Sequence, residues 1–236
     1  MFDPRNFTTP AAKPLPVILL LDVSSSMSGD KIENLNKSVK DMLDTFAQEE
    51  KMETEILVSV ITFGSQVELR VPYTKASQVQ WYDLQANGMT PMGTALEMAK
   101  AMIEDKETTP SRAYRPTVVL VSDGQPNDNW KKPLEDFISE GRSSKCDRMA
   151  MAIGRDADET VLNRFIEGTS HELFYAENVK ELHEFFQRVT MSVTMRTQSK
   201  NPNVVPNPSE IKLDGDSVKS AAIHNTPTSS DDEGYW

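Results

Sequence analysis

The sequence predicts an α/β fold: a doubly wound, Rossmann-like and mostly parallel sheet of six strands with one antiparallel edge strand and helices on both faces. The strands predicted at 15–23 and 117–121 are built on near-continuous apolar runs, which are typical of strands buried on both faces of a sheet. Amphipathic stretches with apolar residues three and four positions apart lie between such runs. This alternation of strands and helices predicts crossover connections and a parallel sheet.

The first strand and the first helix are joined by a short polar loop. Only Pro16, near its start, interrupts the apolar run from residue 15 to residue 21, which fits a strand inside the sheet. Residues 31–48 place their apolar side chains on one side at helical spacing. Asp30, followed by Glu33 three residues later, is the candidate N-cap of this helix.

A hairpin is predicted next, because residues 55–63 and 67–73 flank a Gly-Ser-Gln turn. It would add an antiparallel strand at the edge of the sheet. Residues 79–84 are consistent with a short helix. The remaining elements alternate: a helix from Ala95 to before Pro110, strands at 117–121, 148–153 and 172–175, and helices starting at Pro133 and spanning 158–166 and 179–193.

Three regions are expected along the chain. Residues 1–14 form an N-terminal extension, residues 15–195 one folded domain, and residues 196–236 a flexible acidic tail. The tail has no sustained hydrophobic period, so it buries too little surface to fold alone. Its prolines are Pro202, Pro206, Pro208 and Pro227.

Composition limits the classes of function. The formal net charge of −11 argues against binding to nucleic acid or to an anionic membrane surface. Cys146 is the only cysteine, which excludes an intramolecular disulfide and a cysteine-based zinc cage. No apolar run reaches the roughly 20 residues of a membrane helix, and no signal peptide is recognisable. These features favour a cytoplasmic globular protein.

Oxygen ligands cluster where the first strand ends. Asp22, Ser24 and Ser26 follow the buried run directly, at the edge of an α/β sheet where ligands bind. One carboxylate and two hydroxyls suit a hard divalent cation. Serines are also ordinary turn residues, so this loop alone leaves both interpretations open.

Two later loops favour the metal site. Thr90 lies in a loop with Gly and Pro just before a helical pattern, and Asp123 with Gly124 ends the run at 117–121. Together with Asp22, Ser24 and Ser26, they resemble the metal-ion-dependent adhesion site (MIDAS) of von Willebrand factor A (VWA) domains. The resemblance covers about residues 15–195. The sequences around Asp22, Thr62 and Asp123 are similar to those of the bacterial TerY-like branch of the family, which is associated with tellurium resistance.

The resemblance implies a binding function without catalysis. In that family, the positions of Ser24 and Ser26 ligate a metal directly, whereas Thr90 and the two aspartates alternate between direct and water-mediated contact. Mg²⁺ is the expected cofactor, with Mn²⁺ and Ca²⁺ as alternatives, and an Asp or Glu of a protein ligand completes the coordination. Asp128 is a candidate for orienting the loop after Asp123, although such residues are common in turns.

The expected partners also follow from the resemblance. TerY-like proteins act in bacterial stress and tellurite-resistance systems, beside protein kinases and PP2C-type phosphatases. The acidic residues 231–233 next to Tyr235 and Trp236 allow self-association through the tail, or only a solvated tail. Two other functions stay open: a magnesium-dependent phosphotransferase or hydrolase, and a structural scaffold with a non-essential metal.

Overall fold

The computed structural model describes residues 12–49 and 54–206. The predicted N-terminal extension up to residue 11 and the tail from residue 207 lie outside these residues. Among the residues described, no helix combines the length and apolar character that a membrane span requires.

One sheet of six strands forms the centre of the molecule, in the order β3-β2-β1-β4-β5-β6. β2 and β3 pair antiparallel, and all other neighbouring strands pair parallel. The predicted fold class is therefore confirmed, including the antiparallel edge strand. The strands are β1 (Lys13–Asp22), β2 (Thr54–Phe63), β3 (Val67–Lys75), β4 (Thr117–Ser122), β5 (Asp147–Ile153) and β6 (Phe174–Ala176).

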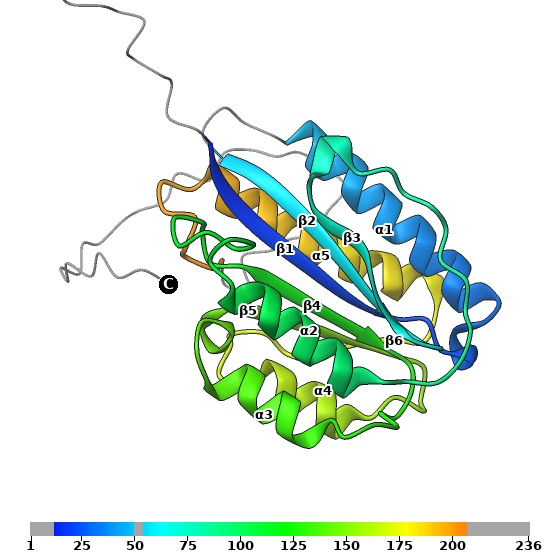
Figure 1. Cartoon of the computed structure of the whole chain (residues 1–236). Coiled ribbons are helices and arrows are strands. Elements are labelled where there is room, and N and C mark those ends of the chain that lie inside the picture. The colour runs from blue at the N-terminus through cyan, green and yellow to red at the C-terminus, as the bar shows by residue number, and fades with distance from the viewer. Residues whose placement is uncertain (1–11, 50–53, 207–236) are drawn as a thin grey trace, which may run out of the picture.

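Helices cover both faces of this sheet (Figure 1). The first and last helices pack on one face, and the other three pack on the opposite face. The helices are α1 (Asp30–Gln48), α2 (Met92–Glu104), α3 (Lys131–Ser139), α4 (Glu159–Ile166) and α5 (Val179–Gln198), with single 3₁₀ turns η2 (Ser25–Met27), η3 (Ala76–Gln78) and η4 (Ser143–Lys145).

β1 lies at the centre of the core and separates its two halves. Leu19 and Leu21 contribute to the cluster under α1 and α5, whereas Ile18 and Leu20 contribute to the cluster under α2, α3 and α4. Successive side chains of a strand point to opposite faces, so a strand between two helical layers must be apolar at every position. The uninterrupted run 17–21 is the consequence.

Two local predictions were wrong. The segment 79–84 forms no helix, because Asn36 of α1 satisfies the backbone of Leu84 on both sides: Leu84 N–H donates to Asn36 Oδ1 at 2.7 Å, and Asn36 Nδ2 donates to the Leu84 carbonyl at 2.9 Å. Asp30 is not the N-cap of α1 but its first residue. Gly29 occupies the cap position, without a side-chain hydrogen bond.

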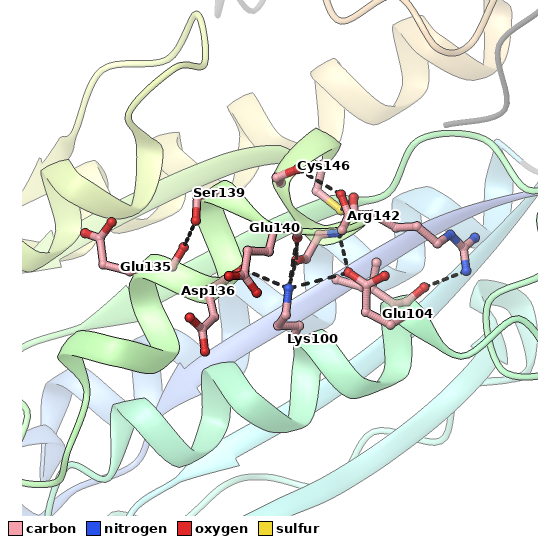
Figure 2. Close-up of polar contacts among 12 residues, drawn as sticks. Lys100, Glu104, Glu135, Asp136, Ser139, Glu140, Arg142 and Cys146 are labelled. Carbon is pink, nitrogen blue, oxygen red and sulfur yellow. Dashed lines mark hydrogen bonds and ion pairs between the residues drawn. The ribbon is translucent and has the colours of Figure 1, made fainter.

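A polar network fixes the carboxyl ends of α2 and α3 (Figure 2). Lys100 Nζ donates to the carbonyls of Asp136 at 2.7 Å and Glu140 at 2.9 Å, and Arg142 donates to the Ile103 carbonyl at 2.6 Å. The last carbonyls of a helix have no partner within the helix, and cations near them are favourable. The two helix ends are thereby tied to each other.

Candidate metal centre

The candidate site lies where β1 and β4 end as neighbours. The two strands are parallel, and their register pairs Leu21 with Val121. Asp22 is the last residue of β1, and Asp123 follows directly after Ser122, the last residue of β4. Both carboxylates therefore reach the same edge of the sheet, at the carboxyl ends of its parallel strands.

Hydrogen bonds join the side chains of both loops. Ser24 Oγ and Ser26 Oγ lie 2.9 Å apart, and Ser26 Oγ donates to Asp123 Oδ1 at 2.8 Å. The Ser24 backbone N–H donates to Asp22 Oδ1 at 2.8 Å, and Ser122 Oγ donates to Asp22 Oδ2 at 2.5 Å. Asp22, Ser24, Ser26 and Asp123 thus form one continuous hydrogen-bonded group.

Thr90 lies beside this group. A Cβ atom on Gly124 would lie 3.5 Å from Thr90 Oγ1 and 3.9 Å from Ser26 Oγ, so both hydroxyls lie close to the same glycine. Two hydrogen bonds hold the Thr90 backbone: its N–H donates to Asn127 Oδ1 at 3.0 Å, and its carbonyl accepts from the Asn127 N–H at 3.1 Å. All the residues that the sequence predicted for the site therefore come together.

The loop after β1 is fixed to the loop before α2 by backbone contacts. The Ser25 N–H donates to the Gly88 carbonyl at 3.0 Å, and the Asn87 N–H donates to the Val23 carbonyl at 2.7 Å. Gly88 has a φ of 82°, and a Cβ there would lie 2.2 Å from the backbone nitrogen of Ser65. A glycine is needed for both reasons, and it allows the loop before α2 to pass close to the turn between β2 and β3.

Asp128 holds the start of α2. Its carboxylate accepts hydrogen bonds from the backbone N–H groups of Gly93 at 3.0 Å and Thr94 at 2.9 Å, and from Thr94 Oγ1 at 3.0 Å. The first N–H groups of a helix have no partner within the helix, so Asp128 caps α2 from another loop. Thr90 precedes this helix by two residues. The contacts of Asp128 therefore lie at the start of α2, whereas the role predicted for it in the loop after Asp123 stays a prediction.

The two carboxylates are buried, whereas one hydroxyl of the site is exposed. Asp22 is 0% and Asp123 1% exposed, and Ser26 lies on the surface. Burial raises the pKa of Asp22, and the charge of Asp123 adds to this effect, while hydrogen bonds from Ser122 and Ser24 oppose it. A cation beside both carboxylates would favour their charged forms.

The available donors fit a hard divalent cation. Within residues 12–49 and 54–206, no group of three His, Cys, Asp or Glu side chains forms a metal site. The predicted residues instead offer two carboxylates and three hydroxyls, a set of oxygen ligands that suits Mg²⁺, Mn²⁺ or Ca²⁺ better than softer metals.

A family model identifies the class of protein. The model of the von Willebrand factor type A domain matches residues 17–188. The chain belongs to the VWA family. This match covers the sheet except for the first four residues of β1, and it covers all the residues of the candidate site.

Relatives of this VWA domain come from diverse sources. Matrilin-3 from Gallus gallus is 25% identical over 174 residues, which are 70% of this chain but only 37% of matrilin-3. The pilus adhesin SpaC from Lactobacillus rhamnosus GG has a TM-score of 0.64 at 15% identity, over 79% of this chain and 30% of SpaC. Proximal thread matrix protein 1 from the mussel byssus, solved with a zinc-occupied MIDAS motif, has a TM-score of 0.55 at 17% identity, over 76% of this chain and 48% of that protein.

Three residues that contact the candidate site were not predicted from the sequence. Ser122 donates to Asp22, Asn127 holds Thr90, and Lys31 Nζ donates to Asp123 Oδ2 at 2.5 Å. Ser122 and Asn127 are close in sequence to Asp123, so proximity was a usable signal for them. The pairing of Lys31 depends on how α1 lies against the loop after β4, which no spacing in the sequence reveals.

Other candidate residues lie outside the VWA site. His171 Nε2 lies 2.8 Å from Asp147 Oδ1, both buried, at the start of β5. His183 of α5 contacts Gln187. Cys146 is buried, and burial raises the pKa of its thiol to about 12.

Proposed function

We propose that this chain is a metal-dependent protein-binding module of the adaptor type. Asp22, Ser24, Ser26, Thr90 and Asp123 hold a divalent cation as a MIDAS, and an Asp or Glu of a partner protein completes its coordination. The observation that supports this most is the hydrogen-bonded group of carboxylates and serines at the sheet edge, with Ser26 on the surface.

The charge of the site favours an external ligand. Two carboxylates balance a divalent cation only formally, and Lys31 offsets one of them. The three hydroxyls are neutral ligands. Mg²⁺ retains water in such sites and often accepts a ligand from outside the host protein. A carboxylate from a partner would replace one of these waters and add negative charge to a site that has Lys31 beside it. Mg²⁺ is the first candidate, and Mn²⁺ and Ca²⁺ follow.

Two structural relatives support this proposal. Proximal thread matrix protein 1 has been solved with zinc in its MIDAS motif, and SpaC is a pilus adhesin. These properties belong to those proteins, and their transfer to this chain is part of the proposal. The chain spans less than half of each.

The proposed cellular setting rests only on the similarity of short sequence stretches to the TerY-like branch. We place the chain in the cytoplasm of a bacterium, in a stress or tellurite-resistance system, with a protein kinase and a PP2C-type phosphatase as partners. No residue of the candidate site bears on tellurium.

We favour binding over catalysis. A phosphotransferase of the haloacid dehalogenase type would need a second aspartate at the position of Ser24. For a hydrolase, the histidines of the described part of the chain are engaged elsewhere, His171 with Asp147 and His183 with Gln187. A serine hydrolase of the usual kind needs a histidine base beside its nucleophile, and neither of these two histidines contacts Ser24 or Ser26.

Calorimetry tests the metal site. Mg²⁺ and Mn²⁺ are titrated into the wild-type chain, Asp22→Asn and the control Asp44→Asn, which removes an equal charge from the exposed face of α1. We expect binding to wild type and control, and a loss of at least about tenfold in affinity for Asp22→Asn, because one charged oxygen ligand is gone. Equal heats in all three proteins would contradict the site and favour a scaffold.

Binding to the candidate partners tests the adaptor function. The purified kinase and phosphatase expected from the resemblance are assayed with wild type in Mg²⁺, in EDTA, and with Asp22→Asn in Mg²⁺. Metal-dependent binding should appear in the first condition alone. Equal binding in all three conditions would show that the partner does not use the metal.

A further inference from the structure

Lys31 places a positive charge directly at the candidate metal centre. It lies in the first turn of α1, and its Nζ donates to Asp123 Oδ2 at 2.5 Å. Ser26 Oγ donates to the other oxygen of the same carboxylate at 2.8 Å. Both oxygens of Asp123 therefore have donors from this chain.

The fold sets the position of Lys31. A Cβ atom on Gly154 would lie 3.7 Å from Lys31 Nζ and 3.9 Å from its Cε, so the end of the lysine lies against the loop after β5. The Lys31 side chain is 35% exposed, whereas that of Asp123 is fully buried. The pair joins a partly solvated cation to a fixed anion, so the lysine is the member that can move.

A divalent cation and the Lys31 ammonium would need the same carboxylate. Asp22 and Asp123 carry two negative charges, and Lys31 reduces this sum to one. A cation bound to Asp123 would also be repelled by an ammonium only a few ångströms away. Metal binding and the Lys31–Asp123 pair therefore oppose each other.

A neighbouring cavity offers Lys31 a second position. It has a volume of about 310 Å³, and Lys31 itself forms part of its wall together with Asp30, Gly154 and Glu177. The carboxylates of Asp30 and Glu177 are suitable neighbours for a displaced ammonium. Both carboxylates line the space toward which a displaced ammonium would turn. Glu177 also pairs with Arg155 at 3.2 Å, so Asp30 has the less engaged charge among the contacts described.

We propose that Lys31 is an internal cation that competes with the metal and so sets the metal concentration at which the site fills. This inference rests on the proposed function. Without metal, Lys31 neutralises Asp123 beside Asp22. When metal binds, Lys31 turns toward the cavity, and the affinity is lower than the carboxylates alone would give.

Calorimetry with Mg²⁺ tests the competition. Lys31→Met keeps the length of the side chain and removes its charge, Lys31→Arg keeps the charge, and Lys37→Met removes an equal charge from an exposed position of the same helix. We expect Lys31→Met to bind Mg²⁺ about fivefold more tightly than wild type, the effect of removing one partly screened charge. Lys31→Arg and Lys37→Met should stay within about twofold of wild type.

Thermal unfolding gives a readout that does not depend on bound metal. In EDTA, Lys31→Met should melt below Lys37→Met, because Asp123 then faces Asp22 without a counter-ion. Saturating Mg²⁺ should close this gap, since the metal takes over the neutralisation. Equal melting of both variants in EDTA would contradict the neutralising role of Lys31.

The outcomes separate this inference from the proposed function. If wild type binds Mg²⁺ and Lys31→Met binds it equally or more weakly, the competition is overturned and the metal site stands. If wild type gives no more heat than Asp22→Asn, the metal site fails, and the role of Lys31 fails with it.

Discussion

Asn127 shows that the candidate site also depends on side chains that are not metal ligands themselves. Its carboxamide accepts from the Thr90 N–H, and its own N–H donates to the Thr90 carbonyl. A hydroxyl can serve a metal only if its backbone is held in place, and Asn127 does this for Thr90 across the gap between two loops. The position of Thr90 is thus set by a residue 37 positions away.

Replacing Asn127 by alanine tests this role. We expect Asn127→Ala to lower the free energy of unfolding by about 1–3 kcal/mol, because the Thr90 N–H loses its acceptor in a partly buried site. Urea denaturation measures the change. The control Asn163→Ala, on the exposed face of α4, should change stability by less than about 0.5 kcal/mol. An equal effect of both substitutions would argue against a special role for Asn127.

At the scale of elements, charged side chains bind the backbone groups at the ends of helices. The network around Lys100 and Arg142 in Figure 2 joins the ends of α2 and α3, and Asp128 caps the start of α2. The apolar spacing of the sequence predicted these helices but not the residues at which they end. The caps come from other elements, so they exist only once the chain is folded.

Glu104 allows a test of this network through pH. Burial alone would raise its pKa, but backbone N–H groups of Ser143 and Arg142 and the charge of Lys100 outweigh burial and lower it below its usual 4.5. A lowered pKa means that ionised Glu104 stabilises the fold above that value, and that this stability is lost as the pH falls through the folded-state pKa.

Glu104→Gln should therefore be less stable than wild type at pH 7, by about 0.5–1 kcal/mol for this partly exposed group. The difference should shrink as the pH falls below about 4.5. Urea denaturation at several pH values measures it, with Glu97→Gln on the exposed side of α2 as the control. A difference that is constant with pH would exclude the ionic contribution.

At the scale of the whole molecule, the sheet could be predicted because its central strands contain uninterrupted apolar runs, at 17–21 in β1 and 118–121 in β4. β1 and β4 matched the prediction closely for this reason, and the site residues followed from where those strands end. What could not be predicted depends on contacts between distant segments. Asn36 binds the backbone of Leu84, so that the segment 79–84 forms no helix. Lys31 contacts Asp123, which is 92 positions away in the sequence.

Arg196 lies just beyond residue 195, the predicted boundary of the folded domain. That boundary stays a prediction. The guanidinium is fully buried and donates to the Pro202 carbonyl at 2.7 Å, to Thr117 Oγ1 at 2.6 Å and to the Arg115 carbonyl at 2.5 Å. Burial lowers its pKa to about 10. It joins α5, the start of β4 and the segment after α5, so a boundary at 195 would remove a central contact.

Arg196→Met should consequently cost about 3 kcal/mol or more of unfolding free energy, because buried acceptors lose their donor. Urea denaturation of the full chain measures this loss. The control Arg155→Met removes a guanidinium that is 86% exposed, and it should be nearly neutral. A small effect of Arg196→Met would mean that the folded domain does not need Arg196, which agrees with the predicted boundary at residue 195.

The long sequence separation within the candidate site has a consequence for synthesis of the protein. Ser26 and Asp123 are 97 positions apart, and Asp22 and Ser122 are 100 apart. A nascent chain on the ribosome cannot assemble this group before β4 has emerged and paired with β1. An ion that binds there would act on finished molecules alone and add to their stability by mass action. Its binding would therefore distinguish chains that have folded beyond β4 from shorter fragments.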